Sequence, residues 1–467
     1  MIKRPARSML ALTVAALAAP SVQAAGFALS TQSASGTGNA FAGGAAIAED
    51  AAVSWYNPAN MTDLRIGTHL SAGVHAIFPS AEFTDQGSWV NPALTGGNID
   101  AAQATLQGGN DDGGNAAGIP QLNVVRTVND RMSLGLAINA PFGLGTKYEE
   151  DWIGRYHALE SAITTVNLNP SIGYKLNEQF SIGAGVSAQY MDVTLDTAID
   201  SAAACLGTAV EENDGLMLAQ CSSALPELSN AATDSKASIS GDDWSYGLNI
   251  GATFKPTERT RLGIHYRSAM DHELEGDVDY TINETFQPIL ATAGVTDFND
   301  AAVTAAANLP DTTSLSVTHQ VNDRFQIMAD YTRTGWSSFE SLTVERDADG
   351  SIVTDVDQSW EDSNRYALGA SYQYSDRLKL RGGVALDESP VPNAQLRTPR
   401  TPDNDRTWLA LGVNYHLNKQ MTLDVGYAHL FADETPIDNT SSDNGYRLRG
   451  LYNNSVDILS AQINWSF

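Results

Sequence analysis

Long apolar runs are almost absent from this chain of 467 residues. A membrane-spanning helix needs ~20 consecutive apolar residues, and the longest apolar run here, from about Met9 to Ala19, reaches about half of that length. This run follows a basic start and precedes small residues at Val22 and Ala24, which is typical of a secretory signal peptide. We therefore predict that residues 1–24 are removed on export. The absence of a longer apolar run argues against a helical inner-membrane protein.

Basic residues are also scarce. The chain has 27 Lys and Arg residues against 55 Asp and Glu residues, so its formal net charge is -28. Proteins bind nucleic acid through Lys and Arg side chains that neutralise phosphates. This charge balance excludes nucleic acid as a partner, and the acidic excess indicates a well-solvated surface.

Only two cysteines are present, Cys205 and Cys221. An exported chain enters an oxidising compartment, where two cysteines this close in sequence are expected to pair. Closing a loop of this size contributes roughly 3 kcal/mol to stability. We predict a disulfide between them, and two unpaired thiols are the alternative.

Catalytic motifs are missing as well. The chain contains no Gly-x-Ser-x-Gly and no His-Glu-x-x-His, and its eight histidines are scattered. We predict that the protein is not an enzyme and that it uses no metal and no cofactor. A Ser/His/Asp site assembled from separate strands is the alternative that the sequence leaves open.

What the chain does have is strict alternation of apolar and polar residues. Every second residue from Leu459 to Phe467 is apolar, and segments 325–331, 409–415 and 421–427 follow the same rule. A period of two predicts β-strands that each turn one face toward an apolar environment. Alternation alone does not tell whether this environment is a protein core or a lipid bilayer.

The connections between these strands distinguish a soluble protein with an apolar core from a barrel in a lipid bilayer. Six short linkers carry turn-forming residues, at 128–131, 176–179, 255–258, 321–324, 374–377 and 417–420. Seven long polar segments alternate with them, at about 79–116, 143–162, 198–236, 278–310, 346–360, 389–404 and 433–452. Short periplasmic turns and long external loops are typical of bacterial outer-membrane barrels.

We therefore predict an all-β fold, a 14-stranded antiparallel transmembrane β-barrel over residues 64–467 with seven long external loops. Such a barrel lies in the outer membrane of a Gram-negative bacterium. A soluble β-sandwich is the alternative, but it would not separate short and long connections so regularly.

Residues 25–63 precede the barrel and are rich in Gly and Ala. We expect them to form a hatch inside the lumen, since so wide a barrel leaves space that side chains alone do not fill. A disordered leader is the alternative.

Several motifs carry a resemblance to a known family. They are "AGFALS" after the signal peptide, "GGAAIAEDAAVSWYNPAN", "APFGLGTKY", "GRYHA", "DESPVPNAQLRTPRTPDNDRTWLALG" and the terminal Phe467. Together, over essentially residues 25–467, the chain resembles the FadL/TodX family of outer-membrane transporters for hydrophobic compounds.

This resemblance implies uptake of long-chain fatty acids, by capture on external loops, movement of the N-terminus and lateral exit through the wall. Phe27 corresponds to the family's ligand-responsive aromatic residue, and Asn57, Pro58 and Ala59 correspond to the hatch motif beside the wall opening. Uptake of aromatic hydrocarbons and a general porin are the alternatives. We expect a monomer that contacts a hydrophobic small molecule and outer-membrane lipid, and a secondary role as a phage receptor stays open.

The sequence departs from the family where basic residues approach the ligand head group. The matching positions are Thr197 and Thr343. The arginines available as substitutes are Arg155, Arg365, Arg397, Arg400 and Arg406. The alternative for each is an ion pair with a nearby acid.

Two further expectations concern the external loops. Leu216 and Met217 in the third loop, and Phe286 and Leu290 in the fourth, are apolar residues in otherwise polar segments, so we expect them to capture ligand. Packing of the loops against each other is the alternative. Residues 298–309 read as a possible helix.

The third strand carries an expected interruption. Asn139 and Pro141 stand at its upper end, and proline cannot donate to a sheet ladder. We predict a lateral break in the wall here or, alternatively, the simple end of the strand. Unpaired backbone groups at such a break need a partner, and Asn57 of the hatch is the expected one.

Overall fold

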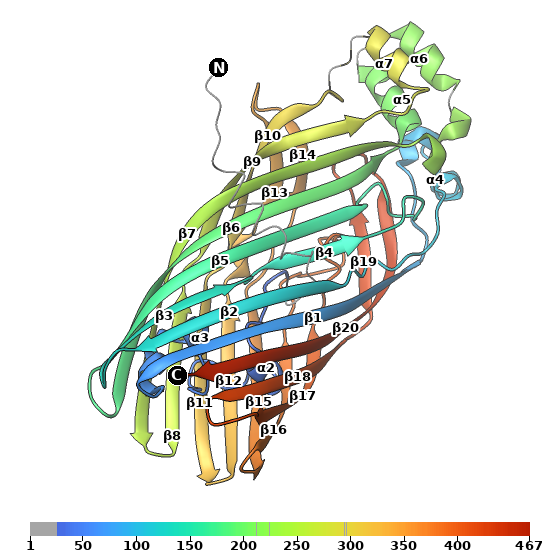
Figure 1. The fold of residues 1–467 in the computed structure, drawn as a ribbon. Helices are drawn as coiled ribbons and strands as arrows, with labels where there is room; N and C mark the ends of the chain where they lie inside the picture. The colour runs from blue at the N-terminus through green and yellow to red at the C-terminus, as the bar shows by residue number, and fades with distance from the viewer. Residues whose placement is uncertain (1–25, 212, 224, 294, 296) are drawn as a thin grey trace.

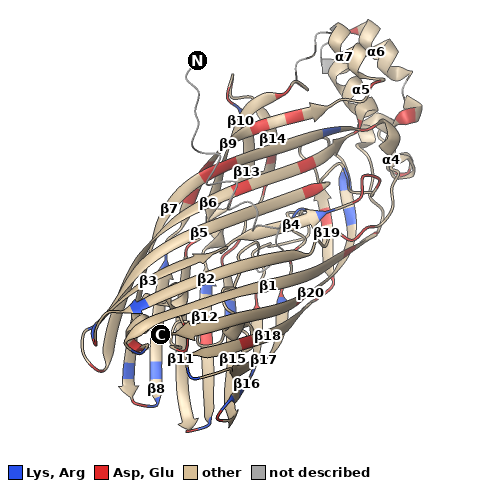
Figure 2. Cartoon of the chain, in the orientation of Figure 1, with Lys and Arg blue, Asp and Glu red and all other residues tan. Residues whose placement is uncertain are grey.

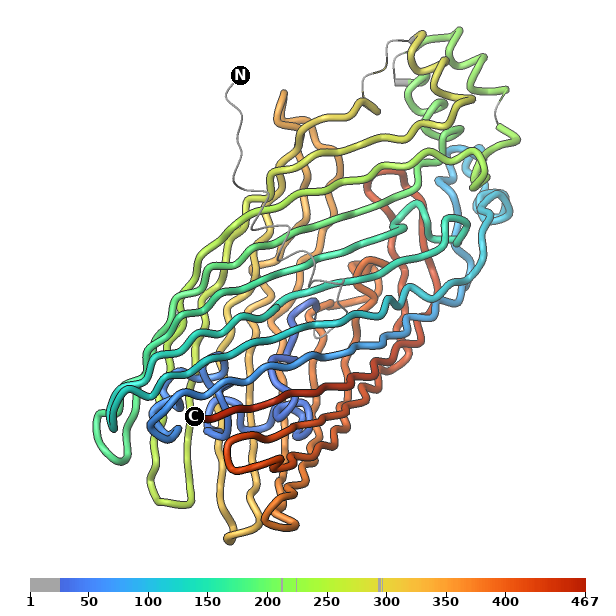
Figure 3. The backbone as a smooth tube through the Cα atoms, in the orientation of Figure 1, coloured from blue at the N-terminus to red at the C-terminus, as the bar shows by residue number. Residues whose placement is uncertain are grey.

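The computed structural model describes residues 26–467 except residues 212, 224, 294 and 296. The predicted signal peptide lies outside the described residues. The described strands form one antiparallel sheet that closes on itself (Figures 1 and 3). Closure occurs at β1 (Gly67–Asp85), which pairs with β2 (Ala117–Thr127) on one side and with the last strand, β20 (Arg447–Ser466), on the other.

The other strands follow in chain order around the barrel. They are β3 (Met132–Asn139), β4 (Gly143–Lys147), β5 (Glu160–Lys175), β6 (Phe180–Ile199), β7 (Ser235–Thr257), β8 (Thr260–Arg267), β9 (Met270–Thr281), β10 (Ala301–Leu309), β11 (Thr312–Asn322), β12 (Phe325–Thr334), β13 (Ser341–Arg346), β14 (Ile352–Asp357), β15 (Ser363–Ser375), β16 (Leu378–Asp387), β17 (Arg406–His416), β18 (Met421–Ala432) and β19 (Thr435–Thr440).

Six of the barrel strands consist of two segments each, namely β3 with β4, β8 with β9, β10 with β11, β12 with β13, β14 with β15 and β18 with β19. The 20 described segments therefore make a closed barrel of 14 strands, as the sequence predicted. Each predicted turn joins two neighbouring antiparallel strands.

The external ends of the strands reach further than the sequence indicated. Residues 301–309 form strand β10 and not a helix, because they pair with β9 on one side and with β13 on the other. The expectation of a helix at 298–309 is therefore wrong. The helical part of this loop is α7 (Gln287–Ala293), which lies beside α5 (Ser201–Glu211) and α6 (Gly215–Ser222) above the barrel (Figure 1).

Shorter helices lie in the loops and in the lumen. In the loops they are η2 (Pro92–Thr95), α4 (Ile99–Thr105), η3 (Leu225–Glu227), η4 (Ala231–Thr233) and η5 (Trp336–Ser338), and before β1 they are α2 (Ala34–Thr37), α3 (Val53–Tyr56) and η1 (Pro58–Asp63). Among the described residues, no helix is long and apolar enough to cross a membrane.

The two faces of the barrel differ in polarity. Along β17, exposed Leu409 and Leu411 alternate with buried Trp408 and Ala410, and buried lumenal positions elsewhere carry many Asn, Gln, Ser and Thr side chains. Acidic side chains gather toward the loop end of the barrel, on β6, β7 and β9 (Figure 2). The outer face is thus apolar and the inner face largely polar, as the alternation predicted.

Residues 26–63 lie inside the barrel, near its turn end (Figure 3). Hydrogen bonds join them to strands around the wall: Thr37 to Ser460, Ala51 to Ser71, Thr62 to Ser181 and Asn60 to Thr253. We call residues 26–63 the hatch. The hatch is therefore held from several sides of the wall.

Candidate ligand-binding site

An aromatic cluster surrounds Phe27, near the N-terminal end of the hatch. It consists of Phe27, Phe142, Trp336, Phe339 and Trp360. The ring of Phe27 lies 4.7 to 6.1 Å, centroid to centroid, from the other four, and its side chain is only 2 % exposed. Among these residues the sequence pointed to Phe27 alone, through the family resemblance. The other four lie in loops and at a strand interruption far from Phe27 in sequence, and only the tertiary structure brings them to it.

Further apolar side chains extend this cluster along the wall. They are Leu144, Ile163, Met191, Val193, Leu195, Met270, Leu274, Ala307, Leu309 and Val391. We call the aromatic cluster and these residues together the lumenal apolar cluster. An apolar group inside it is removed from water on most sides, and such burial is favourable by about 25 cal/mol per Å².

Phe27 is positioned by backbone contacts with the interruption of the third strand. Leu29 N donates to Pro141 O at 2.8 Å, and Gly143 N donates to Phe27 O at 2.9 Å. Gly26 N donates to Asp403 Oδ2 at 2.9 Å. The first described residues therefore lie beside residues 141–143, joined by an isolated antiparallel bridge between Ala28 and Phe142.

The third strand is interrupted where the sequence predicted. β3 ends at Asn139, β4 begins at Gly143, and β4 pairs with β5 but, among the described residues, not with β2. Gln32 Nε2 donates to Ala140 O at 2.7 Å inside this interruption. Backbone groups of residues 140–143 at the interruption therefore form hydrogen bonds with residues 27–32 of the hatch.

Asn57 does not reach the interruption, so the expectation that it pairs there is wrong. Its Nδ2 lies within hydrogen-bonding distance of Ala252 O and Ile264 O, at 3.2 and 3.3 Å. These carbonyls face each other on β7 and β8, which are separated from β3 by β5 and β6. Pro58 and Ala59 follow Asn57 in the chain and lie against Gly183 of β6.

Arg400 places a guanidinium at the loop end of the lumenal apolar cluster. Its Nη1 donates to Ser161 Oγ at 2.9 Å and its Nη2 donates to the Thr197 hydroxyl. Ser161 and Thr197 lie two residues beyond Ile163 and Leu195 of the lumenal apolar cluster. A cation from the β16–β17 loop therefore stands at one of the two positions where the resemblance led us to expect a basic side chain.

No carboxylate lies within 4.0 Å of the Arg400 guanidinium among the described residues. Desolvation by the surrounding loops lowers the pKa of Arg400 to about 10, and acids farther away oppose this effect. The guanidinium therefore stays charged at neutral pH. Thr343, the second expected position, instead donates its hydroxyl to Asp355 at 2.6 Å.

The other arginines are engaged elsewhere. Arg155 is fully buried between loops, where it pairs with Asp234 at 2.7 Å and donates to Ser229 O at 2.8 Å. Arg397 donates to the backbone carbonyls of Asp403 and Pro436, Arg406 lies near Asp387 and Asp403, and Arg365 donates to Ala40 O of the hatch. Arg155 in particular does not face the lumenal apolar cluster, because its partners hold it inside the loops.

The apolar loop residues fall into two groups. Met217, Phe286 and Leu290 are buried together beside the disulfide, whereas Leu216 is 69 % exposed. The disulfide joins Cys205 of α5 to Cys221 of α6, as predicted, with the two Cα atoms 5.6 Å apart. Three of the four expected capture residues therefore pack the loops against each other.

No group of three or more His, Cys, Asp or Glu side chains is placed to hold a metal ion within the part of the chain that the structure describes. The site as described consists of apolar and aromatic side chains with a cation at its loop end. This combination suits a ligand that is itself apolar with one polar end.

Known proteins match this chain over nearly its whole length. Residues 15–467 match the family described as "Outer membrane protein transport protein (OMPP1/FadL/TodX)". A long-chain fatty acid transport protein of Escherichia coli O6:H1 is 30% identical over 427 residues, which cover 91% of this chain and 90% of that protein.

Solved structures agree with this assignment. The crystal structure of a Pseudomonas aeruginosa FadL homologue superposes with a TM-score of 0.82 at 25% identity, covering 95% of this chain and 100% of that one. The Pseudomonas putida toluene transporter TodX shares the fold, with a TM-score of 0.66 at 18% identity over 95% of this chain and 99% of that one. This chain therefore belongs to the OMPP1/FadL/TodX family of transport proteins of the Gram-negative outer membrane, which is a family of transporters and not of enzymes.

Proposed function

We propose that this protein takes up long-chain fatty acids across the outer membrane. The observation that carries the proposal is the lumenal apolar cluster with the Arg400 guanidinium at its loop end. A fatty acid has the same two parts, an apolar chain and a carboxylate. The name of the Escherichia coli relative supports this choice of ligand.

The apolar chain supplies most of the binding energy. Each buried methylene contributes about 0.8 kcal/mol, so affinity rises steeply with chain length. Arg400 adds a charge-assisted hydrogen bond to the carboxylate and sets its orientation. The acid then lies with its head group toward the loops.

Phe27 occupies the place that the chain would take. Its ring fills the centre of the aromatic cluster, so a bound acyl chain displaces it. Because Phe27 and Leu29 are joined by hydrogen bonds to residues 141–143, this displacement also uncovers the interruption between β3 and β4. Lateral exit of the ligand through the interruption follows from this coupling.

Capture from outside begins on the exposed apolar side chains of the third loop. Val210, Leu216, Leu218 and Leu225 are between 38% and 69% exposed. Met217, Phe286 and Leu290 hold these side chains in place from below. The exposed side chains therefore form an apolar surface on the loops, and the buried side chains pack beneath this surface and hold it in place.

The other partners in this proposal are lipids. Exposed Leu, Ile, Val and aromatic side chains on the outer face of the barrel contact outer-membrane lipid. The closed sheet needs no second copy to satisfy its edges, so the protein acts as a monomer.

Aromatic hydrocarbons are the second candidate ligands. The four rings around Phe27 favour them, but a hydrocarbon such as toluene makes no use of the cation at Arg400. A general porin is disfavoured because the hatch is bonded to the wall from several sides.

The test is binding of saturated fatty acids from octanoate to stearate to the purified protein. We expect affinity to rise with chain length, and we expect Arg400→Met to weaken stearate binding about tenfold while stearyl alcohol binds as before. Absence of a chain-length trend would contradict uptake of fatty acids. Tighter binding of toluene than of stearate would favour the second candidate.

A further inference from the structure

A second arginine lies in the lumen below the lumenal apolar cluster. Arg267 is 8 % exposed and, among the described residues, has no carboxylate within 4.0 Å. Its Nη1 donates to Ser187 Oγ at 3.0 Å and its Nη2 donates to Trp55 O at 3.2 Å, and its guanidinium carbon lies 3.4 Å above the Trp55 ring. Both hydrogen-bond acceptors are neutral, so the charge of this buried guanidinium has no counter-ion nearby.

A buried amide without hydrogen-bond partners among the described residues lies beside this arginine. Asn249 lies opposite Arg267 on the neighbouring strand. It is fully buried, and neither its Nδ2 nor its Oδ1 has a partner among the described residues. A buried amide without a partner is costly, and natural proteins leave few of them. These two neighbouring side chains therefore offer free hydrogen-bonding capacity that the protein itself does not use.

Polar side chains continue from Arg267 to the interruption of the third strand. Asn169 Nδ2 donates to Ser187 Oγ at 3.2 Å, and two residues along β5 Asn167 Nδ2 donates to Asn139 Oδ1 at 3.4 Å. Asn139 is the last residue of β3, and its own Nδ2 has no partner. We call Arg267, Ser187, Asn249, Asn169, Asn167 and Asn139 the lumenal polar row.

The polar row lies between the lumenal apolar cluster and the hatch. On β6 the inward-facing Met191 of the apolar cluster is followed by Gln189 and then Ser187 toward the turn end. On the hatch side, Trp55 packs under Arg267. Arg267 is therefore a second cation on the turn-end side of the lumenal apolar cluster, whereas Arg400 lies at its loop end.

From this arrangement we infer that the lumenal polar row is a second binding site for the carboxylate of the ligand, centred on Arg267 and Asn249 and leading to the interruption between β3 and β4. This inference rests on the proposed function. The guanidinium compensates the negative charge, and the Asn249 and Asn139 amides supply N–H donors along the way. Arg400 then holds the head group on entry, and Arg267 holds it before exit.

The two arginines have separable effects in uptake measurements. We compare initial rates of uptake of oleate and of oleyl alcohol in cells that carry equal amounts of each variant. Arg267→Met is expected to lower the maximal rate for oleate about tenfold, because one charge-assisted hydrogen bond is lost, and to change the rate for oleyl alcohol less than about twofold. Arg267→Lys, which keeps the charge, is expected to restore most of the oleate rate.

A matched control separates this role from support of the hatch. Arg365 also stacks near an aromatic ring, that of Trp408, and donates to a hatch carbonyl, Ala40 O, but it lies on β15, away from the polar row. Arg365→Met is expected to leave the ratio of oleate to alcohol uptake unchanged. If Arg267→Met lowers both rates equally, or lowers neither, the inferred site is wrong.

Asn249→Leu provides a second, independent test. Because the Asn249 side chain has no hydrogen bond to lose, the variant is expected to fold with equal or higher thermal stability, and a several-fold loss of oleate uptake then shows that the amide serves the ligand. Unchanged oleate uptake in this stable variant would overturn the site. Failure of the proposed function would look different, since the wild-type protein would then take up neither ligand.

Discussion

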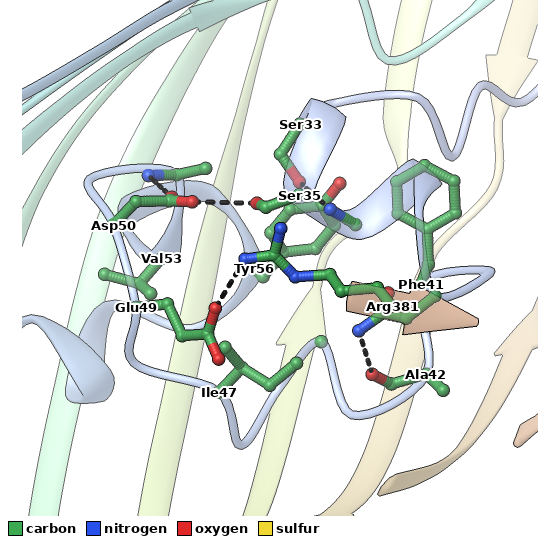
Figure 4. A pocket seen from close by; sticks show the side chains of 14 residues that line it. Ser33, Ser35, Phe41, Ala42, Ile47, Glu49, Asp50, Val53, Tyr56 and Arg381 are labelled. Atoms are coloured by element: carbon green, nitrogen blue, oxygen red, sulfur yellow. Dashed lines mark hydrogen bonds and ion pairs between the residues drawn. The ribbon is translucent and has the colours of Figure 1, made fainter. Parts of the chain in front are cut away.

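Arg381 of strand β16 donates a hydrogen bond to Glu49 of the hatch, with Nη2 and Oε2 2.7 Å apart. Figure 4 shows Arg381 pointing toward Glu49 at a small pocket lined by the hatch. The same guanidinium also donates to Asp424 of β18. The Arg381–Glu49 contact is an ion pair between the wall and the hatch. Most other contacts between the hatch and the wall are neutral hydrogen bonds.

Removing the cation should loosen the hatch. In Arg381→Met, the side chains of Glu49 and Asp424 lose the buried cation that they share, and breaking a buried ion pair costs about 3 kcal/mol or more. We expect a lower melting temperature of the purified protein and faster proteolysis of the hatch. Lys379→Met is the control, because Lys379 pairs with Glu49 at 3.0 Å but is partly exposed, and it should cost less than about 1 kcal/mol. Equal effects of the two variants would contradict this assignment.

The same contact should depend on pH. Burial opposes ionisation of Glu49, but the charges of Lys379 and Arg381 outweigh burial and hold its pKa below the usual range. A lowered pKa in the folded state stabilises the protein above the ordinary Glu pKa of about 4.3, and this stability is lost as the pH falls below that value. We expect the melting temperature to fall more steeply in acid for the wild type than for Glu49→Gln. Parallel pH curves for the two proteins would show that Glu49 contributes nothing to this dependence.

Close contact between hatch and wall should make a side chain at Gly251 of β7 destabilising. A β-carbon at Gly251 would lie 2.1 Å from Asn57 Oδ1, whereas one at Gly382 would lie 3.7 Å from its nearest neighbour, Leu411. Overpacking typically costs ~1–3 kcal/mol. We expect Gly251→Ala to lower the melting temperature and to raise ion conductance in planar bilayers, while Gly382→Ala behaves as the wild type. If Gly251→Ala changes neither the melting temperature nor the conductance, the hatch accommodates the added methyl group without loss of stability, and the prediction is wrong.

Phe27 should compete with the ligand. In Phe27→Ala the centre of the aromatic cluster is vacated, so an acyl chain no longer has to displace a ring, and we expect stearate to bind several-fold more tightly. Tryptophan fluorescence reports the binding, because Trp336 and Trp360 contact Phe27. Leu29→Ala is the control, since Leu29 is buried in the same segment but outside the cluster. Weaker binding in Phe27→Ala would instead indicate that Phe27 contacts the bound ligand.

Capture and packing in the loops should be separable. Leu216→Ser removes an exposed apolar side chain and is expected to slow uptake at low ligand concentration while stability is unchanged. Phe286→Ser removes a buried ring from the core of the loops and is expected to destabilise the loops by about 3 kcal/mol, which limited proteolysis detects. Normal uptake in Leu216→Ser would leave the loops with a structural role only.

Much of the fold follows from local patterns in the sequence. Alternation such as that from Leu459 to Phe467, together with the contrast between short turns and long loops, predicts the number and direction of the strands, because a strand's side-chain period and a tight turn are local properties. Pro141 likewise marks an interruption, since its missing N–H is a property of the residue itself. The cysteine pair was predictable because the two residues are close in sequence.

The contacts inside the lumen were not predictable in this way. Asn57 was expected at the third strand and lies instead against β7 and β8, and Arg400 reaches Thr197 across more than two hundred residues of sequence. Which side chains share a level of the lumen depends on the register of every strand in between, and register is a property of the closed sheet.

The sequence by itself therefore determined that the chain forms a fourteen-stranded barrel preceded by a segment that is not needed for the wall, because the period of the strands and the residues of the turns are each encoded within a few neighbouring residues. Only the tertiary structure decided which arginine stands at the apolar cluster, what covers the interruption of the third strand, and that Arg267 lies without a counter-ion beside an unpartnered Asn249. The physical reason is that charge compensation and hydrogen bonding depend on distances across the lumen, and these distances exist only after the barrel has closed around its hatch.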